Sequence, residues 1–139
     1  MANTKVWIVD DDPEFLAELG EALELSGLDA EAFRDAASMR RRLGLEAPDI
    51  VLLDLKMEHE DGFRLARELR GHPRTANVPM IAMTGHCTST EDAVRVGACG
   101  LDLCLVKPIN LAELLARIAL LTGDRKSTRL NSSHVSQSR

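Results

Sequence analysis

Five short apolar runs alternate with amphipathic stretches along this chain, and no other feature constrains its fold as strongly. The apolar runs predict β-strands, and a run as apolar as Ile50–Asp54 is typical of a parallel strand buried on both faces. The stretches between the runs place apolar residues at spacings of three and four, which predicts amphipathic helices. The predicted strands lie at about 6–9, 29–33, 50–54, 80–84 and 103–106, and the helices at about 13–26, 35–44, 63–69, 91–96 and 111–122.

This alternation predicts an α/β fold in which helices cover both faces of a parallel sheet. The 139 residues suffice for one domain with a core of its own. In open sheets of this kind, functional residues collect at the carboxyl ends of the strands, around the point where the strand order reverses. The side chains at those ends are therefore the first candidates for a functional site.

Composition excludes several classes of function. A net charge of −5 and an aromatic content of 3% disfavour a nucleic-acid partner, which would need basic and stacking surfaces. No apolar run reaches the ~18–20 residues of a membrane-spanning helix, and no signal-peptide pattern opens the chain. The cysteines, Cys87, Cys99 and Cys104, are odd in number and form no CxxC pair, so we expect free thiols in the cytoplasm. A redox role for Cys99 and Cys104 is the alternative to simple burial in the core.

The last sixteen residues differ from the rest. Residues 124–139 are polar and serine-rich without apolar periodicity, and they follow Gly123, which could end the last helix. We therefore predict a folded domain over residues 1–123 and a disordered tail over 124–139, which could also be a cloning or read-through remnant. Without the tail the chain has 21 acidic and 13 basic residues, so the folded part carries a net charge of −8.

Charged and hydroxyl side chains stand at the ends of four predicted strands: Asp10, Asp11, Asp12, Asp54, Thr84 and Lys107. Carboxylates crowded in a half-buried cleft repel one another, and a hard cation such as Mg²⁺ relieves that repulsion. A lysine and a hydroxyl at the same edge suit a phosphoryl group. The simplest chemistry is a carboxylate nucleophile that becomes an aspartyl-phosphate. Asp12 directly precedes Pro13, so we interpret it as a helix cap.

These residues also carry a resemblance to a known family. Asp10-Asp11 after a strand, LLDLKM around Asp54, IAMTG around Thr84 and LVKPI around Lys107 resemble the receiver domain of bacterial response regulators. The resemblance covers about residues 5–121, and GFRLARELR, VPMIAMTG and LVKPINLAELLARI look most like receivers of hybrid sensor histidine kinases. It implies a doubly wound, flavodoxin-like (βα)5 three-layer sandwich. The implied strand order is 2-1-3-4-5.

The resemblance also implies a role for each residue. Asp54 would be the phosphoacceptor, with Thr84 and Lys107 contacting the phosphoryl group. Mg²⁺ (or Mn²⁺) would be held by Asp11 directly, by Asp10 largely through water, by Asp54, and by the backbone carbonyl of Lys56. The bond between Lys107 and Pro108 would be cis.

One segment and three single residues bear on how this chain departs from the family or tunes its chemistry. Glu58-His59-Glu60 replaces a common proline-glycine segment beside the metal site, and His59 is either an extra ligand or solvent-exposed. Cys104 occupies the position of the family's switching aromatic residue, so we expect a smaller transmitted change. Lys56 and His86 stand at positions that tune the phosphoryl lifetime in the family.

The function implied is that of a phosphorelay switch, which has only self-phosphorylation and slow autodephosphorylation as activities. Its partners would be a histidine kinase or histidine phosphotransfer protein and a downstream target or fused output domain. They would dock near the first helix for phosphotransfer and near the fourth helix, fifth strand and fifth helix for output. We expect a monomer or a phosphorylation-dependent dimer.

The alternative from another class is a small aspartyl-phosphate hydrolase of the haloacid dehalogenase type, but Pro13-Glu14 follows the acids where that family needs glycine-threonine. An FMN binder of the same fold ranks last because the chain lacks a phosphate loop and aromatic residues to sandwich a flavin. A receiver that has lost phosphorylation is disfavoured because all five hallmark residues are present.

Overall fold

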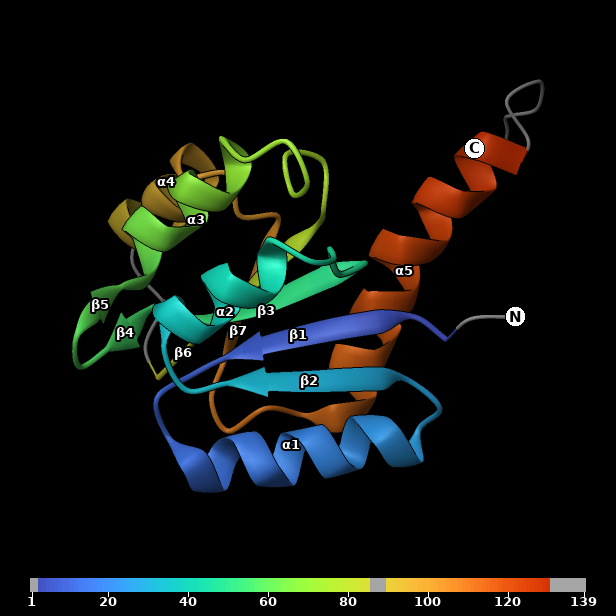
Figure 1. The fold of residues 1–139 in the computed structure, drawn as a ribbon, viewed down its shortest axis with the longest axis horizontal. Coiled ribbons are helices and arrows are strands. Elements are labelled where there is room, and N and C mark those ends of the chain that lie inside the picture. Colours follow the sequence, from blue (N-terminus) through green and yellow to red (C-terminus); the bar gives the residue numbers. More distant parts are fainter. Residues whose placement is uncertain (1–2, 86–89, 131–139) are drawn as a thin grey trace.

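A computed structural model, which describes residues 3–85 and 90–130, confirms the predicted parallel sheet (Figure 1). Its strand order is β2-β1-β3-β6-β7, with every neighbouring pair parallel. Since β6 and β7 are the fourth and fifth strands of this sheet along the chain, the order is the expected 2-1-3-4-5. The strands are β1 (Lys5–Val9), β2 (Asp29–Phe33), β3 (Ile50–Asp54), β6 (Met80–Thr84) and β7 (Leu103–Val106).

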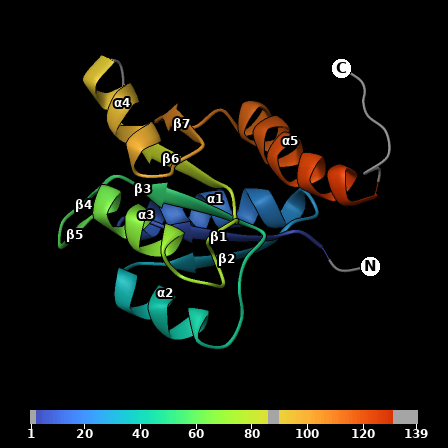
Figure 2. The same ribbon diagram turned by 90° about the horizontal axis from the view of Figure 1, so that it is seen from above.

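Helices cover both faces of the sheet and give three layers (Figure 2). Two helices pack with one set of strand residues and three with the other. On one side lie α1 (Pro13–Leu25) and α5 (Leu111–Leu130), and on the other lie α2 (Ala36–Leu43), α3 (Gly62–Arg70) and α4 (Thr90–Ala98).

The strand β1 shows how one apolar run serves both layers. Val6 and Ile8 pack toward α1 and α5, whereas Trp7 and Val9 pack toward the other three helices. Successive side chains of a strand point to opposite faces, so a run buried on both sides must be apolar at every position. The Trp7 ring also meets Phe33 of β2 edge to face, at 5.1 Å between centroids.

Short polar side chains begin the helices where the sequence predicted caps. Asp12 Oδ1 accepts hydrogen bonds from the backbone N–H groups of Glu14 and Phe15, at 3.0 and 3.3 Å. Asp35 accepts from the N–H of Ser38 at the start of α2. The interpretation of Asp12 as a helix cap is therefore confirmed, and α1 leaves the end of β1 in a fixed direction.

Two features differ from the expectations. The last helix does not end at Gly123 but continues to Leu130, because a glycine weakens a helix by only about 1 kcal/mol and need not end it. A small antiparallel sheet, β4 (Lys56–Met57) with β5 (Glu60–Asp61), stands between β3 and α3. Its strands are too short to leave a periodic pattern in the sequence.

In the described part of the chain, no helix has the length and apolar character needed to cross a membrane. His86 and Cys87 lie outside the described residues. Cys99 is a buried free thiol, as expected, and Cys104 is half-buried.

Candidate functional site

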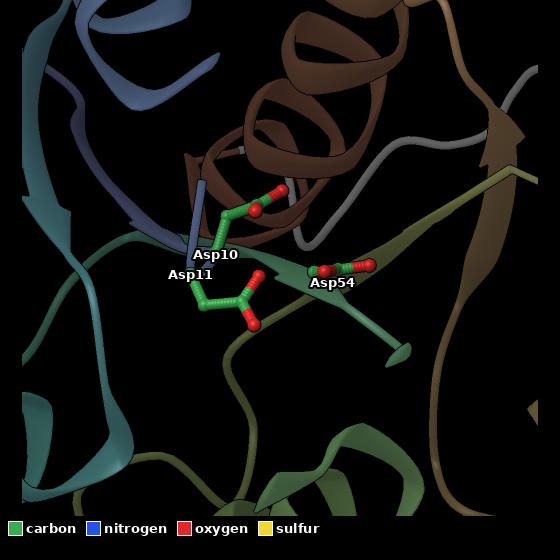
Figure 3. A group of neighbouring side chains, drawn as sticks. All are labelled: Asp10, Asp11 and Asp54. Atoms are coloured by element: carbon green, nitrogen blue, oxygen red, sulfur yellow. The ribbon is translucent and has the colours of Figure 1, made fainter. Parts of the chain in front are cut away.

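The predicted residues come together where the strand order reverses. The strands β1 and β3 are neighbours in the sheet. The connection after β1 leads to β2, toward one edge of the sheet, and the connection after β3 leads to β6, toward the opposite edge. The carboxyl ends of these two central strands therefore border the same crevice. Figure 3 shows the carboxyl groups of Asp10, Asp11 and Asp54 facing a common space there.

The three carboxylates form a compact cluster. Asp10, Asp11 and Asp54 each offer one oxygen atom, and these atoms all lie within 4.8 Å of one another. Asp10 is fully buried, Asp54 is 5% exposed and Asp11 is half-buried. Among the described residues this is the group that could hold a metal ion, and His59 is not a member of it.

A backbone N–H group orients each carboxylate of the cluster. Asp10 Oδ1 accepts from the N–H of Asp12 at 2.9 Å, and Asp54 Oδ1 accepts from the N–H of Lys56 at 3.2 Å. Asp11 Oδ2 accepts from the N–H of Glu58 at 2.6 Å. Backbone N–H groups of the segment after β3 thus orient two of the three acids. One is Asp54, at the end of β3, and the other is Asp11, which follows β1.

Lys107 brings a positive charge to the cluster. Its Nζ lies 2.6 Å from Asp10 Oδ2 and 3.9 Å from Asp54 Oδ1. Its backbone N–H donates to the carbonyl of Thr84 at 2.7 Å, which ties the end of β7 to the end of β6. Thr84 is 1% exposed, and the bond between Lys107 and Pro108 is cis, as expected.

Burial is the main electrostatic influence on Asp54. Burial raises the pKa of the Asp54 carboxyl to about 6, and the neighbouring charge of Asp10 adds to the increase. The Lys56 N–H and the Lys107 ammonium oppose it by stabilising the carboxylate. With all three acids ionised, one lysine leaves the cluster two charges short of neutrality. A divalent cation fits that deficit and the oxygen donors present.

The other predicted residues lie around this cluster. Lys56 is on β4, with an exposed side chain, and Cys104 packs against the core cluster shared by α2, α3 and α4. The His59 side chain is 91% exposed at the tip of the β4–β5 hairpin, which agrees with the solvent-exposed interpretation. With Asp11 and Glu58 it lines a polar pocket of about 550 Å³.

One contact of the site has no signal in the sequence. The ring centroid of Phe15 lies 4.2 Å from Lys107 Nζ. Phe15 and Leu19 stand four residues apart on α1, a spacing that by itself indicates only a helix face turned toward the core.

Comparisons with known proteins agree on one family. The family model described as the response regulator receiver domain matches residues 6–119. The chain is 35% identical to the transcriptional regulatory protein PrrA of Mycobacterium tuberculosis, over 97% of this chain and 57% of that protein. It is 28% identical to the sensor protein EvgS of Escherichia coli, over 84% of this chain and 9% of that protein. Both relatives are longer, and the chain spans little more than half of PrrA.

Solved structures give the same result. The signal receiver domain of a signal transduction histidine kinase from Syntrophus aciditrophicus matches with a TM-score of 0.79 and 28% identity, over 98% of this chain and 99% of that one. The chain is thus similar to receivers of histidine kinases, but its identity to transcriptional regulators such as PrrA is higher, so the comparisons do not favour the hybrid-kinase likeness that the motifs suggested.

Proposed function

Because this chain belongs to the response regulator receiver domain family of two-component signalling, we propose that it accepts a phosphoryl group on Asp54. The observation that carries the proposal is the position of the Asp54 carboxyl, which lies within 4.8 Å of the carboxylates of Asp10 and Asp11 and 3.9 Å from the ammonium of Lys107. This arrangement pairs a nucleophile with the charges that a phosphoryl group requires.

In the proposed reaction, a carboxylate oxygen of Asp54 attacks the phosphorus atom of a donor phosphohistidine. An O–P bond forms, and the N–P bond breaks with its electron pair returning to the imidazole. The Lys107 ammonium then pairs with the phosphoryl oxygens, and the Thr84 hydroxyl donates a hydrogen bond to one of them. Burial keeps competing water away from Asp54, which is 5% exposed.

The donor set fits Mg²⁺ or Mn²⁺. Asp10, Asp11, Asp54 and the backbone carbonyl of Lys56 would hold the ion. When bound, it would neutralise the charge that the carboxylates and the phosphoryl oxygens share. The family and the relatives above favour this receiver function over a haloacid dehalogenase-type hydrolase. We further propose that the chain acts as a switch with only slow autodephosphorylation, rather than as an enzyme with turnover.

Partners follow from the same proposal. The donor is a histidine kinase or histidine phosphotransfer protein, and the receiver of the signal is a downstream protein or a fused output domain. The free thiol of Cys99 supports a cytoplasmic location. The family match ends at residue 119, which supports a domain over residues 1–123 followed by a tail over 124–139, whose first residues continue α5 to Leu130. Phosphorylation would either leave a monomer or produce a dimer.

The test is phosphorylation by acetyl phosphate with Mg²⁺, followed by intact mass measurement. We expect one phosphate adduct, which Asp54→Asn abolishes. Asp12→Asn is the matched control, since asparagine also caps a helix and Asp12 lies outside the carboxylate cluster. Absence of both an adduct and Mg²⁺ binding in the unmodified chain would overturn the proposal.

Two basic residues are proposed to tune the lifetime of the phosphoryl group. Lys56 and His86 would hinder or orient the water that hydrolyses it. Lys56→Ala and His86→Ala are expected to change the dephosphorylation rate after removal of the donor. An unchanged rate in both variants contradicts this role.

A further inference from the structure

The Lys107 ammonium has an apolar neighbour as well as acidic ones. Its Nζ lies 2.6 Å from Asp10 Oδ2 and 3.9 Å from Asp54 Oδ1, and the centroid of the Phe15 ring lies 4.2 Å from the same atom. We propose that Phe15 is a positioning residue that holds this ammonium between the two carboxylates and thereby sets the rate of Asp54 phosphorylation. This inference rests on the proposed function of Asp54.

The ring is itself held firmly by the start of α1. The backbone N–H of Phe15 donates to the cap Asp12 at 3.3 Å, and Pro13 restricts the backbone of the same turn. The half-buried ring packs against the core cluster shared by α1 and α5. Together with Leu19 and Lys107 it also lines an apolar groove of about 280 Å³.

An aromatic ring attracts the Lys107 ammonium, which an aliphatic side chain at this position could not do. The face of a benzene ring carries partial negative charge and attracts an ammonium, most strongly where water is excluded. The Lys107 side chain is 25% exposed, so the ring replaces part of its hydration. A lysine side chain has four rotatable bonds, and without the ring many more of its rotamers would keep the ammonium in solvent.

The ring also allows the Lys107 ammonium to move from Asp10 toward Asp54 when Asp54 is phosphorylated. Before the reaction, the hydrogen bond of Lys107 is with Asp10, and Asp54 is beyond hydrogen-bond distance. A phosphoryl group on Asp54 requires the ammonium to move toward that side. Attraction to a ring face has no single preferred direction within the face, so the ammonium can move from Asp10 toward Asp54 without losing this contact.

The test compares Phe15→Leu, which keeps an apolar side chain, with Phe15→Tyr, which keeps the ring. Leu19→Met, one helical turn further along the same groove, is the matched control for packing. The first measurement is the rate of phosphorylation by acetyl phosphate with Mg²⁺. We expect Phe15→Leu to be about three- to tenfold slower than the unmodified chain, and the other two variants to stay within about twofold of it.

The second measurement needs neither metal nor phosphoryl donor. Reductive methylation of Lys107, followed by peptide mass spectrometry with Lys5 as internal reference, is expected to be several-fold faster in Phe15→Leu only. The proposal is overturned if Phe15→Leu leaves both rates unchanged, or if Phe15→Tyr or Leu19→Met loses as much as Phe15→Leu. If the unmodified chain is not phosphorylated at all, the proposed function fails, while the methylation rates still decide whether Phe15 holds Lys107.

Discussion

Helices α1 and α4 both follow strands that end at the carboxylate cluster, but they are attached to the sheet in different ways. Along α1, Leu16, Leu19 and Leu23 are buried, and the cap at Asp12 fixes its first turn. Among the described side chains of α4, only Val96 is buried. One helix is therefore part of the core, and the other lies on its surface.

The attachment of α4 depends on a side chain from its last turn. The guanidinium of Arg95 lies 4.0 Å from the centroid of the Phe63 ring and 3.8 Å from Asp61, the cap of α3. Asp61 pairs with Lys56 in the β4–β5 hairpin, and the Lys56 N–H donates to Asp54. Elements with few buried contacts open at lower free energy than the core. We expect α4 to be the readier of the two helices to respond to changes at Asp54.

The largest effect should come from the core side of α1. Leu23→Ala is expected to lower the free energy of unfolding by about 3 kcal/mol, because Leu23 is fully buried and its loss leaves a cavity. Leu25→Ala is the control, since Leu25 is 83% exposed and should change stability by less than about 0.5 kcal/mol. Urea denaturation measures both. Equal losses would remove the basis for calling α1 a core helix.

The next effect concerns Asp54, at the end of β3, the strand that lies between β1 and β6, which α1 and α4 follow. Burial raises its pKa to about 6, so the folded chain keeps a proton that the unfolded chain releases near pH 4. The free energy of unfolding should therefore fall as the pH rises from about 4 to 6, by on the order of 2–3 kcal/mol in metal-free solution. Asp54→Asn should remove this fall and be the more stable chain at pH 7.

Urea denaturation at a series of pH values, without divalent cations, checks the prediction. Asp12→Asn again serves as the control, and it should keep the fall. A pH dependence that is the same in Asp54→Asn and in the unmodified chain would show that ionisation of Asp54 does not lower the free energy of unfolding.

Two helical glycines allow a matched comparison of α1 with α4. Neither Gly20 nor Gly97 has an atom within 4 Å of the position that a Cβ would take. Alanine at either site should favour its helix by about 0.5–1 kcal/mol. We expect Gly20→Ala to raise the global free energy of unfolding. Gly97→Ala should instead slow amide hydrogen exchange within α4, with a smaller global change. A global gain of the same size for both would contradict the difference between the helices.

The smallest expected effect is that of Arg95 on global stability. Arg95→Met should change the free energy of unfolding by less than about 0.5 kcal/mol, because the pair with Asp61 is exposed. It should nevertheless speed hydrogen exchange in α4 several-fold while leaving α3 unchanged. Arg64→Met, at an exposed position of α3, is the control. Unchanged exchange in α4 would mean that Arg95 does not hold the helix.

The sheet and the composition of the site were predictable because both follow from local patterns. The apolar run of β3 ends at Asp54, and the carboxyl ends of parallel strands meet at one edge, so its neighbours at that edge could be inferred. The hairpin of β4 and β5 was missed because two-residue strands leave no periodic signal. The contacts of Arg95 with Phe63 and of Phe15 with Lys107 join distant segments through side-chain direction, which no spacing rule encodes.

The distance along the chain between Asp10 and Lys107 has a consequence for the synthesis of the protein. Lys107 is 97 residues further from the N-terminus than the carboxylate it neutralises. At ~5–20 residues per second, a ribosome adds the lysine roughly 5–20 seconds after Asp10. The strand β7, which Lys107 directly follows, is the last of the described strands to be synthesised and lies at the edge of the sheet. A nascent chain therefore cannot complete the proposed phosphoacceptor site until β7 has joined the sheet and placed Lys107 beside Asp10.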